Sequence, residues 1–179
     1  EQRLSEGSYK RDTRYSFDLD AMTYDRHDIV EGEWKARAEE TAVPFLEGAL
    51  DDVSFLFFAR LLPLEVGQRY EFDRYFKDSG NPVVIEVLRR EEIRVPAGTF
   101  QTIVLRPIIQ TGGAFGDGGE AELYLTDDDR RAIVRLKIGM AVGAGNLFLT
   151  DYHPGEGELI PILDAPEVRE TNETEGAMP

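Results

Sequence analysis

A long apolar hairpin between Pro82 and Gly113 constrains the fold of this chain more than any other feature. Two runs rich in β-branched residues flank the segment from Val95 to Phe100, a pattern that predicts two long antiparallel strands. Pro96 presets φ for a turn, and Gly98 tolerates the positive φ that a tight turn needs. We therefore expect an antiparallel sheet built around this hairpin.

The two strands of the hairpin differ in pattern. The first has apolar residues of one parity, but Arg89 and Glu91 interrupt them, which predicts a β-bulge or a point where the strand leaves the core. The second, from Phe100 to Ile109, is apolar on both parities, which is typical of a central strand covered on both faces.

The remaining strands are shorter, and most alternate between apolar and polar residues. The first of them, Ser8 to Leu19, alternates cleanly and so has one wet face. It begins a predicted meander. The other expected strands are Met22 to His27, a segment marked by Trp34, Ala36 and Ala38, Arg69 to Phe76, Glu120 to Leu125, Ala132 to Ile138, and Asn146 to Tyr152.

One helix is expected from Asp51 to Leu62. The segment opens with acids that can cap backbone N–H groups and ends at Pro63. Its large apolar residues fall almost all round a helix, which predicts burial on several sides in the hollow of a curved sheet. The alternative is a ninth buried strand, because short apolar runs are ambiguous. The apolar residues are Phe55, Leu56, Phe57, Phe58, Leu61 and Leu62.

These patterns predict a mainly β fold: a strongly curved antiparallel sheet, half-barrel or open barrel, of about eight to nine strands with one buried helix near 51–62. A chain of 179 residues can bury a sizeable core as one domain, here 1–153. Residues 154–179 are rich in acids and are expected to form an acidic tail.

Charge and composition exclude several classes of partner. The formal net charge of -15 repels phosphate backbones, so nucleic acid is not an expected partner. The chain has no cysteine and hence no disulfide or thiolate site. No apolar run is long enough for a transmembrane segment, and the chain opens into an amphipathic strand without a signal peptide.

No motif predicts a catalytic, cofactor or metal site. The glycine-rich loop from Gly112 to Gly119 precedes a strand, not a helix, so we expect a flexible hairpin loop in which Phe115 acts as a gate. The acids from Thr126 to Arg131 lack the spacing of a calcium loop and predict a charged turn. His27 and His153 have no partner at zinc-site spacing.

Several segments together carry a family resemblance. They are Leu64 to Gly67 with Tyr70 to Phe72, the turn from Val95 to Phe100, the loop from Gly112 to Gly119, and Tyr124 to Asp128. From about Glu1 to Tyr152 the chain resembles the bacterial envelope family catalogued as domain of unknown function 3108. The resemblance implies a periplasmic or outer-envelope location, a curved sheet similar to lipoprotein-carrier folds, and no established activity.

The resemblance also implies a departure. Members of that family usually carry an export signal and further strands before the segment that resembles Glu1 to Leu4, and neither is seen here. Ser8 to Leu19 is therefore expected to be an open edge that pairs with a partner protein or with the acidic tail.

The resulting functional hypothesis is a non-enzymatic envelope protein that binds an apolar or amphiphilic ligand, such as a lipid, or a partner protein on the concave face of its sheet. One alternative is a structural subunit that docks through the strand 8–19 and the acidic tail. An enzyme of unknown reaction is a third. The expected ligand-binding residues are Trp34, Phe57, Phe58, Tyr70, Phe72 and Phe115.

Overall fold

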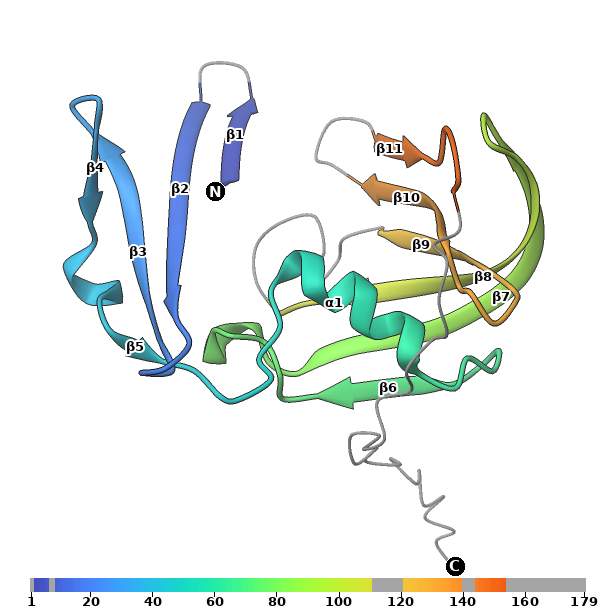
Figure 1. Ribbon diagram of the computed structural model, residues 1–179, viewed down its shortest axis with the longest axis horizontal. Coiled ribbons are helices and arrows are strands. Elements are labelled where there is room, and N and C mark those ends of the chain that lie inside the picture. The colour runs from blue at the N-terminus through green and yellow to red at the C-terminus, as the bar shows by residue number, and fades with distance from the viewer. Residues whose placement is uncertain (1, 7–8, 111–120, 140–143, 154–179) are drawn as a thin grey trace, which may run out of the picture. The chain divides into compact units, whose positions relative to one another are not determined.

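The computed structural model describes residues 2–6, 9–110, 121–139 and 144–153 (Figure 1). The predicted mainly β, antiparallel class with one short α-helix is confirmed within these residues. The strands form two sheets, of five and six strands, instead of one sheet of eight to nine. The chain divides into two compact units at Ala49 and Leu50, where a single unit from 1 to 153 was expected.

The first unit holds the five-stranded sheet. Its strands are β1 (Gln2–Glu6), β2 (Tyr9–Asp18), β3 (Thr23–Val30), β4 (Glu33–Ala36) and β5 (Val43–Pro44). The order is β1-β2-β3-β4, with β5 also paired to β3. A short 3₁₀-helix, η1, spans Ala38–Glu40.

The expectation that Ser8 to Leu19 forms an open edge is wrong. β1 pairs with the first half of β2, from Glu6↔Tyr9 to Gln2↔Thr13, and β3 pairs with the second half. The expectation overlooked that Gln2 to Glu6 is long enough to return along β2, and that Gly7-Ser8 is a turn-forming dipeptide.

The five-stranded sheet buries few of its described side chains. Among those from Asp12 to Ala49, only Thr13, Tyr24 and Arg26 are less than a tenth exposed. Tyr24 lies beside Tyr15 and Phe17, with ring centroids 6.0 and 6.2 Å apart. This unit therefore rests on a small aromatic cluster and on polar contacts.

The second unit holds the six-stranded sheet, in the order β11-β10-β9-β8-β7-β6. The central strand β8 lies between β7 and β9. Ile103, Val104 and Leu105 on β8 are at most 2% exposed, which confirms a strand covered on both faces. The strands are β6 (Arg69–Phe72), β7 (Val83–Val95), β8 (Gly98–Ile108), β9 (Glu122–Thr126), β10 (Ile133–Gly139) and β11 (Ala144–Phe148).

The hairpin of β7 and β8 forms as predicted, and both long strands curve (Figure 1). Val95 pairs with Gly98 around a two-residue turn, and Gly98 has the expected positive φ of 140°. The predicted bulge is confirmed, because the register shifts between Val87 and Arg89. A further 3₁₀-helix, η3, spans Asp78–Gly80.

The segment after Asp51 is a helix, not a ninth strand: α1 spans Asp52–Phe58 and continues as the 3₁₀-helix η2, Ala59–Leu61. The predicted acidic cap is present. The Asp51 carboxylate accepts hydrogen bonds from the amides of Ser54 and Val53 at 2.7 and 3.2 Å, and the Ser54 hydroxyl accepts one from the Asp51 amide at 2.8 Å. This capping box fixes where the helix begins.

The prediction that this helix is buried on several sides is wrong. α1 lies across the sheet of β6 to β11 (Figure 1) and packs on one face of it through Phe55 and Phe58. Phe57 is 52% exposed because it points away from that sheet, as do its neighbours on the outer side. No helix among the described residues is long and apolar enough to cross a membrane.

Candidate functional site: an apolar ridge and a polar network

Three of the predicted ligand-binding residues are core residues. Phe58 meets Phe72 edge to face at 5.0 Å between centroids, and Tyr70 stacks on Phe72 at 6.4 Å. All three are at most 9% exposed, and the Tyr70 hydroxyl donates a hydrogen bond to the carbonyl of Pro63. They fill the space between the helix and the sheet, so a ligand could contact them only if α1 moved away.

The other predicted residues are not gathered at one place. Trp34 lies on β4 in the first unit, half-buried, with the guanidinium of Arg14 4.3 Å from its ring centroid. Phe57 lies on the outer side of α1 in the second unit. Phe115, the loop from Gly112 to Gly119 and the acidic tail lie outside the described residues.

The outer side of the helix carries an apolar ridge, which we define as Val53, Phe57 and Leu61. These residues follow one another at intervals of four along α1 and η2, and their exposed fractions are 61%, 52% and 57%. Residues four apart lie close together on a helix surface. The ridge therefore presents three large apolar side chains to solvent on one element.

The ridge rests on a helix that is anchored at both ends. At the start, the Tyr75 hydroxyl donates to the Asp52 carboxylate at 2.9 Å, beyond the capping box. At the end, the Arg131 guanidinium donates to the carbonyls of Arg60, at 2.8 Å, and Leu62. These contacts satisfy carbonyls that the last turn of a helix leaves open.

Arg131 is the last residue of the predicted charged turn after β9, which the structure confirms. The Asp128 carboxylate accepts hydrogen bonds from the Thr126 hydroxyl at 2.6 Å and from the amides of Arg130 and Arg131 at 3.1 Å. The hydrogen bond from Thr126 is the main reason why the pKa of Asp128 is lowered. The acids of this turn thus position Arg131 against the helix.

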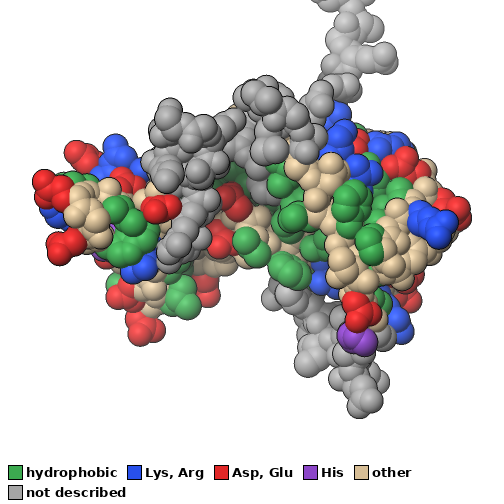
Figure 2. All heavy atoms as spheres, turned by 90° about the horizontal axis from the view of Figure 1, so that it is seen from above, with side chains coloured by type: hydrophobic (Ala, Val, Ile, Leu, Met, Phe, Trp, Pro, Cys, Tyr) green, Lys and Arg blue, Asp and Glu red, His purple; other side chains and the backbone are tan. Residues whose placement is uncertain are grey.

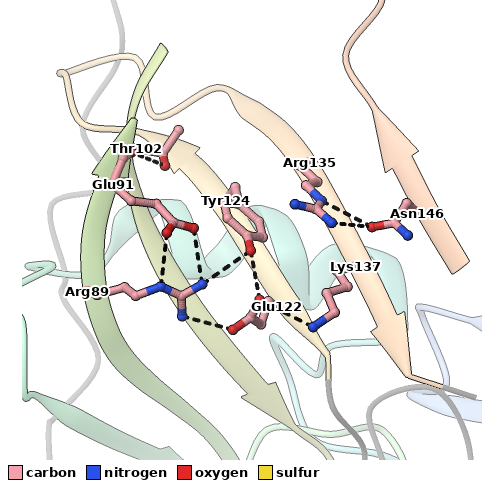
Figure 3. A network of polar contacts seen from close by, with 8 residues as sticks. All are labelled: Arg89, Glu91, Thr102, Glu122, Tyr124, Arg135, Lys137 and Asn146. Atoms are coloured by element: carbon pink, nitrogen blue, oxygen red, sulfur yellow. Dashed lines mark hydrogen bonds and ion pairs between the residues drawn. The ribbon is translucent and has the colours of Figure 1, made fainter. Parts of the chain in front are cut away.

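The opposite face of the six-stranded sheet carries a polar network (Figure 3). Its centre is Arg89 on β7, which donates to Glu122 at 2.9 Å, to Glu91 at 3.1 and 3.3 Å and to the Tyr124 hydroxyl at 3.3 Å. Tyr124 in turn donates to Glu122 at 2.7 Å, and the ammonium of Lys137 lies 3.8 Å from that carboxylate. The network joins β7, β9 and β10.

Two bulges place the arginines of this face. Before the bulge in β7, Val87 pairs with Leu105, and after it Arg89 pairs with Val104, whose side chain points to the other face. A similar shift in β10 lies between Ile133 and Arg135. Without the bulge, residues two apart would lie on the same face of the sheet. Because of it, the arginine lies on the face opposite to the apolar residue two positions before it.

Arg135 completes this face next to the network. Its guanidinium lies 5.1 Å from the ring centroid of Tyr124 and 5.3 Å from that of Phe148, and it donates twice to the Asn146 side chain, at 2.6 and 3.1 Å. The arginine therefore links β9, β10 and β11 through ring contacts and hydrogen bonds.

The protonation states of the network follow from its contacts. The hydrogen bond from Arg89 lowers the pKa of Glu122, so this carboxylate is ionised at neutral pH. Burial, together with the hydrogen bond to Glu122, raises the pKa of Tyr124 to about 12. A general acid or base works best with a pKa near the operating pH. At neutral pH Glu122 instead stays ionised and Tyr124 stays protonated, and the network links β7, β9 and β10.

Sequence reasoning missed this network because no pattern distinguishes Glu122 among 35 acids. The available signal was the charged pair Arg89 and Glu91 inside an apolar strand, together with the alternation of Glu122 and Tyr124 with leucines. Connecting the two strands required the register and the position of the bulge.

The fold and these surfaces define a class: a mainly β protein with two antiparallel sheets, one of them covered by a capped helix. Within that class, the chain belongs to the family described as protein of unknown function DUF3108, whose model matches residues 1–150. Neither a curated protein nor a solved structure matches the chain.

Proposed function

We propose that this chain is a non-enzymatic protein of the bacterial envelope that binds a partner protein through the apolar ridge of α1. The observation that supports the proposal is the exposure of Val53, Phe57 and Leu61 by more than half on a helix whose inner side is fully packed. Large apolar groups in water are costly, and a helix that lays such groups into a groove is a common mode of recognition.

The shape of the ridge favours a protein over a lipid as its partner. Sites for small apolar molecules are concave and enclose most of the ligand. The ridge is convex, since it lies on the outer side of a helix, and the apolar face beneath that helix is filled by Phe58, Tyr70 and Phe72. A partner protein with an apolar groove can cover a convex ridge, whereas a single acyl chain cannot enclose it.

One residue of the ridge and a neighbour match the composition of interface centres. Arg60 lies beside Phe57, with its guanidinium 5.8 Å from the ring centroid, and aromatic residues and arginine are enriched at the core of interfaces. The helix is also anchored by Asp51 at one end and Arg131 at the other, so little ordering accompanies binding.

Site-specific crosslinking tests this proposal in cells of the source organism. A photo-reactive phenylalanine analogue at position 57 is expected to crosslink one envelope protein, whereas the same analogue at Val66, which is 47% exposed but lies outside the ridge, is expected not to. Phe57→Asp should then abolish co-purification of that protein at fixed stoichiometry and leave the unfolding free energy within about 1 kcal/mol of the wild type.

Two results would contradict the proposal. One is equal crosslinking from positions 57 and 66. The other is saturable binding of an environment-sensitive fluorescent fatty acid by delipidated protein, weakened by Phe57→Asp, which would favour a lipid carrier. Fractionation of the source cells provides a separate test of the envelope location.

A further inference from the structure

The two edges of the six-stranded sheet differ in their chemistry. On β6, Arg69 and Glu71 alternate with buried Tyr70 and Phe72, and Arg69 forms ion pairs with Glu71 and with Glu86. Charged side chains on an edge strand discourage pairing with another chain. The β6 edge is therefore protected.

The other edge, β11, has no such protection. The run from Ile138 to Thr150 contains no charged residue and is the longest such run in the chain. Leu147 is 64% exposed and Phe148 45% exposed. β10 and β11 lie near the top of Figure 1, and Figure 2 views the molecule from above. In that view apolar side chains reach the surface of the unit that holds these strands.

The backbone of β11 has one side available for pairing. β11 ends the strand order, so β10 is its only neighbour among the described strands. The Leu149 amide donates to the Val134 carbonyl at 2.9 Å, and backbone groups alternate in direction along a strand. The N–H and C=O groups of Asn146 and Phe148 therefore point away from β10.

We propose that β11 pairs with β11 of a second copy of this chain, antiparallel and around a two-fold axis, to join the two six-stranded sheets. Antiparallel pairing of identical strands is two-fold symmetric, as an isologous dimer requires. With Leu147 on the axis, Asn146 of each copy exchanges backbone hydrogen bonds with Phe148 of the other.

Charge supports a second copy as the occupant. Two molecules that each carry a formal charge of -15 repel each other over most of their surfaces. The uncharged run at β11 is where two copies can approach with the least repulsion, and there Leu147 would face Leu147 across the axis. Such a short interface predicts a weak dimer that forms at high protein concentration.

The absence of cysteine from the chain allows a direct test with single-cysteine variants. A pair that faces its symmetry mate without backbone hydrogen bonds has Cα atoms about 4.5 Å apart, within the range that a disulfide spans. Leu147→Cys is thus expected to form a disulfide dimer under mild oxidation at least tenfold faster than Val66→Cys, the matched exposed control.

Sedimentation of the unmodified chain supplies an independent measurement. We expect the average mass to rise with concentration, and Leu147→Lys, which sets two ammonium groups against each other, to abolish that rise, with Val66→Lys again as the control. Phe148→Pro removes an outward N–H without breaking the ladder to β10 and should act in the same way.

Three results would overturn the inference: a monomer at all concentrations up to several hundred micromolar, a dimer that survives Leu147→Lys, or equal oxidation rates for the two cysteine variants. Hydrogen exchange of each lysine variant shows whether its sheet is still folded. The ridge variant Phe57→Asp is expected to leave dimerisation unchanged, which separates this inference from the proposed function.

Discussion

The two sheets of this chain are stabilised in different ways. In the five-stranded sheet, the described buried side chains include Arg26, which is 6% exposed and is held by Glu40 at 2.6 Å and Asp28 at 3.1 Å. In the unit of the six-stranded sheet, Phe55 of α1, Ile85, Leu105 and many other apolar side chains are fully buried. One sheet depends on a charged cluster and a small aromatic cluster, and the other on apolar packing under a helix.

The two antiparallel sheets of one chain can therefore differ in stability. Apolar burial contributes roughly 25 cal/mol per Å², whereas a buried ion pair has to offset the desolvation of its charges. We therefore expect the five-stranded sheet to lose its structure first. The single tryptophan, Trp34, lies in that sheet and reports its unfolding separately from circular dichroism, which is dominated by the larger sheet.

The largest expected effect is in the apolar core between α1 and the six-stranded sheet. Phe55→Ala removes a ring that is 0% exposed and should lower the unfolding free energy of the six-stranded sheet by about 3 to 5 kcal/mol, because a cavity remains. Phe57→Ala on the same helix should cost less than about 1 kcal/mol. Urea denaturation followed by circular dichroism measures both. Equal losses would show that the outer side of α1 is also packed.

The second effect concerns the charged cluster. Arg26→Met keeps the length of the side chain but removes the buried guanidinium that joins Asp28 to Glu40, while Arg37 stays 3.7 Å from Asp28; the change should cost about 2 to 3 kcal/mol. The loss should shift the Trp34 fluorescence transition to lower urea and leave the circular dichroism transition of the other sheet in place. A common shift of both transitions would mean that the two sheets unfold as one unit.

The contrast between the sheets also shows what could be predicted from the sequence. The hairpin, its turn at Gly98, the bulge before Arg89 and the cap at Asp51 all follow from local residue patterns, and all were predicted correctly. Such features depend on neighbours in sequence. Local residue patterns and turn or capping residues therefore locate them.

Features that depend on distant neighbours were missed. The division into two sheets depends on which strands pair with one another, and the burial of α1 on one side follows from the position of its sheet. The pattern of six apolar residues around a helix could not show which of them, such as Phe57, would stay outside. Likewise, the pairing of Arg89 with Glu122 depends on a register across three strands.

The third effect is an acid sensitivity that Glu122 gives to the six-stranded sheet. The pKa of Glu122 is lowered in the folded state from its ordinary value of 4.5, so its stabilisation is complete above that value and is lost as the pH falls through the lowered pKa. Glu122→Gln should cost about 1.5 to 3 kcal/mol at pH 7 and progressively less as the pH falls through the lowered pKa of Glu122. Denaturant melts at several pH values measure this. A cost that stays constant with pH would mean that the charge of Glu122 does not matter.

The smallest expected effect is at Tyr124, whose hydroxyl accepts a hydrogen bond from Arg89 and donates one to Glu122. Tyr124→Phe should cost about 1 kcal/mol at pH 7, since the ring and its contacts with the two arginines remain. The folded-state pKa is raised from 10.0 to about 12, so the protonated phenol contributes fully below pH 10 and its contribution is lost as the pH rises toward 12.

Absorbance of the ionised phenol follows this titration directly. Among the seven tyrosines, Tyr124 should ionise late, and Tyr124→Phe should remove the part of the curve near pH 12. Tyr70, whose pKa is also raised by burial, provides the control, because Tyr70→Phe removes a phenol from the helix-covered face instead. If both variants removed the same part of the curve, the network would raise the pKa of Tyr124 no more than the apolar face raises that of Tyr70. Burial alone would then account for the raised pKa of Tyr124.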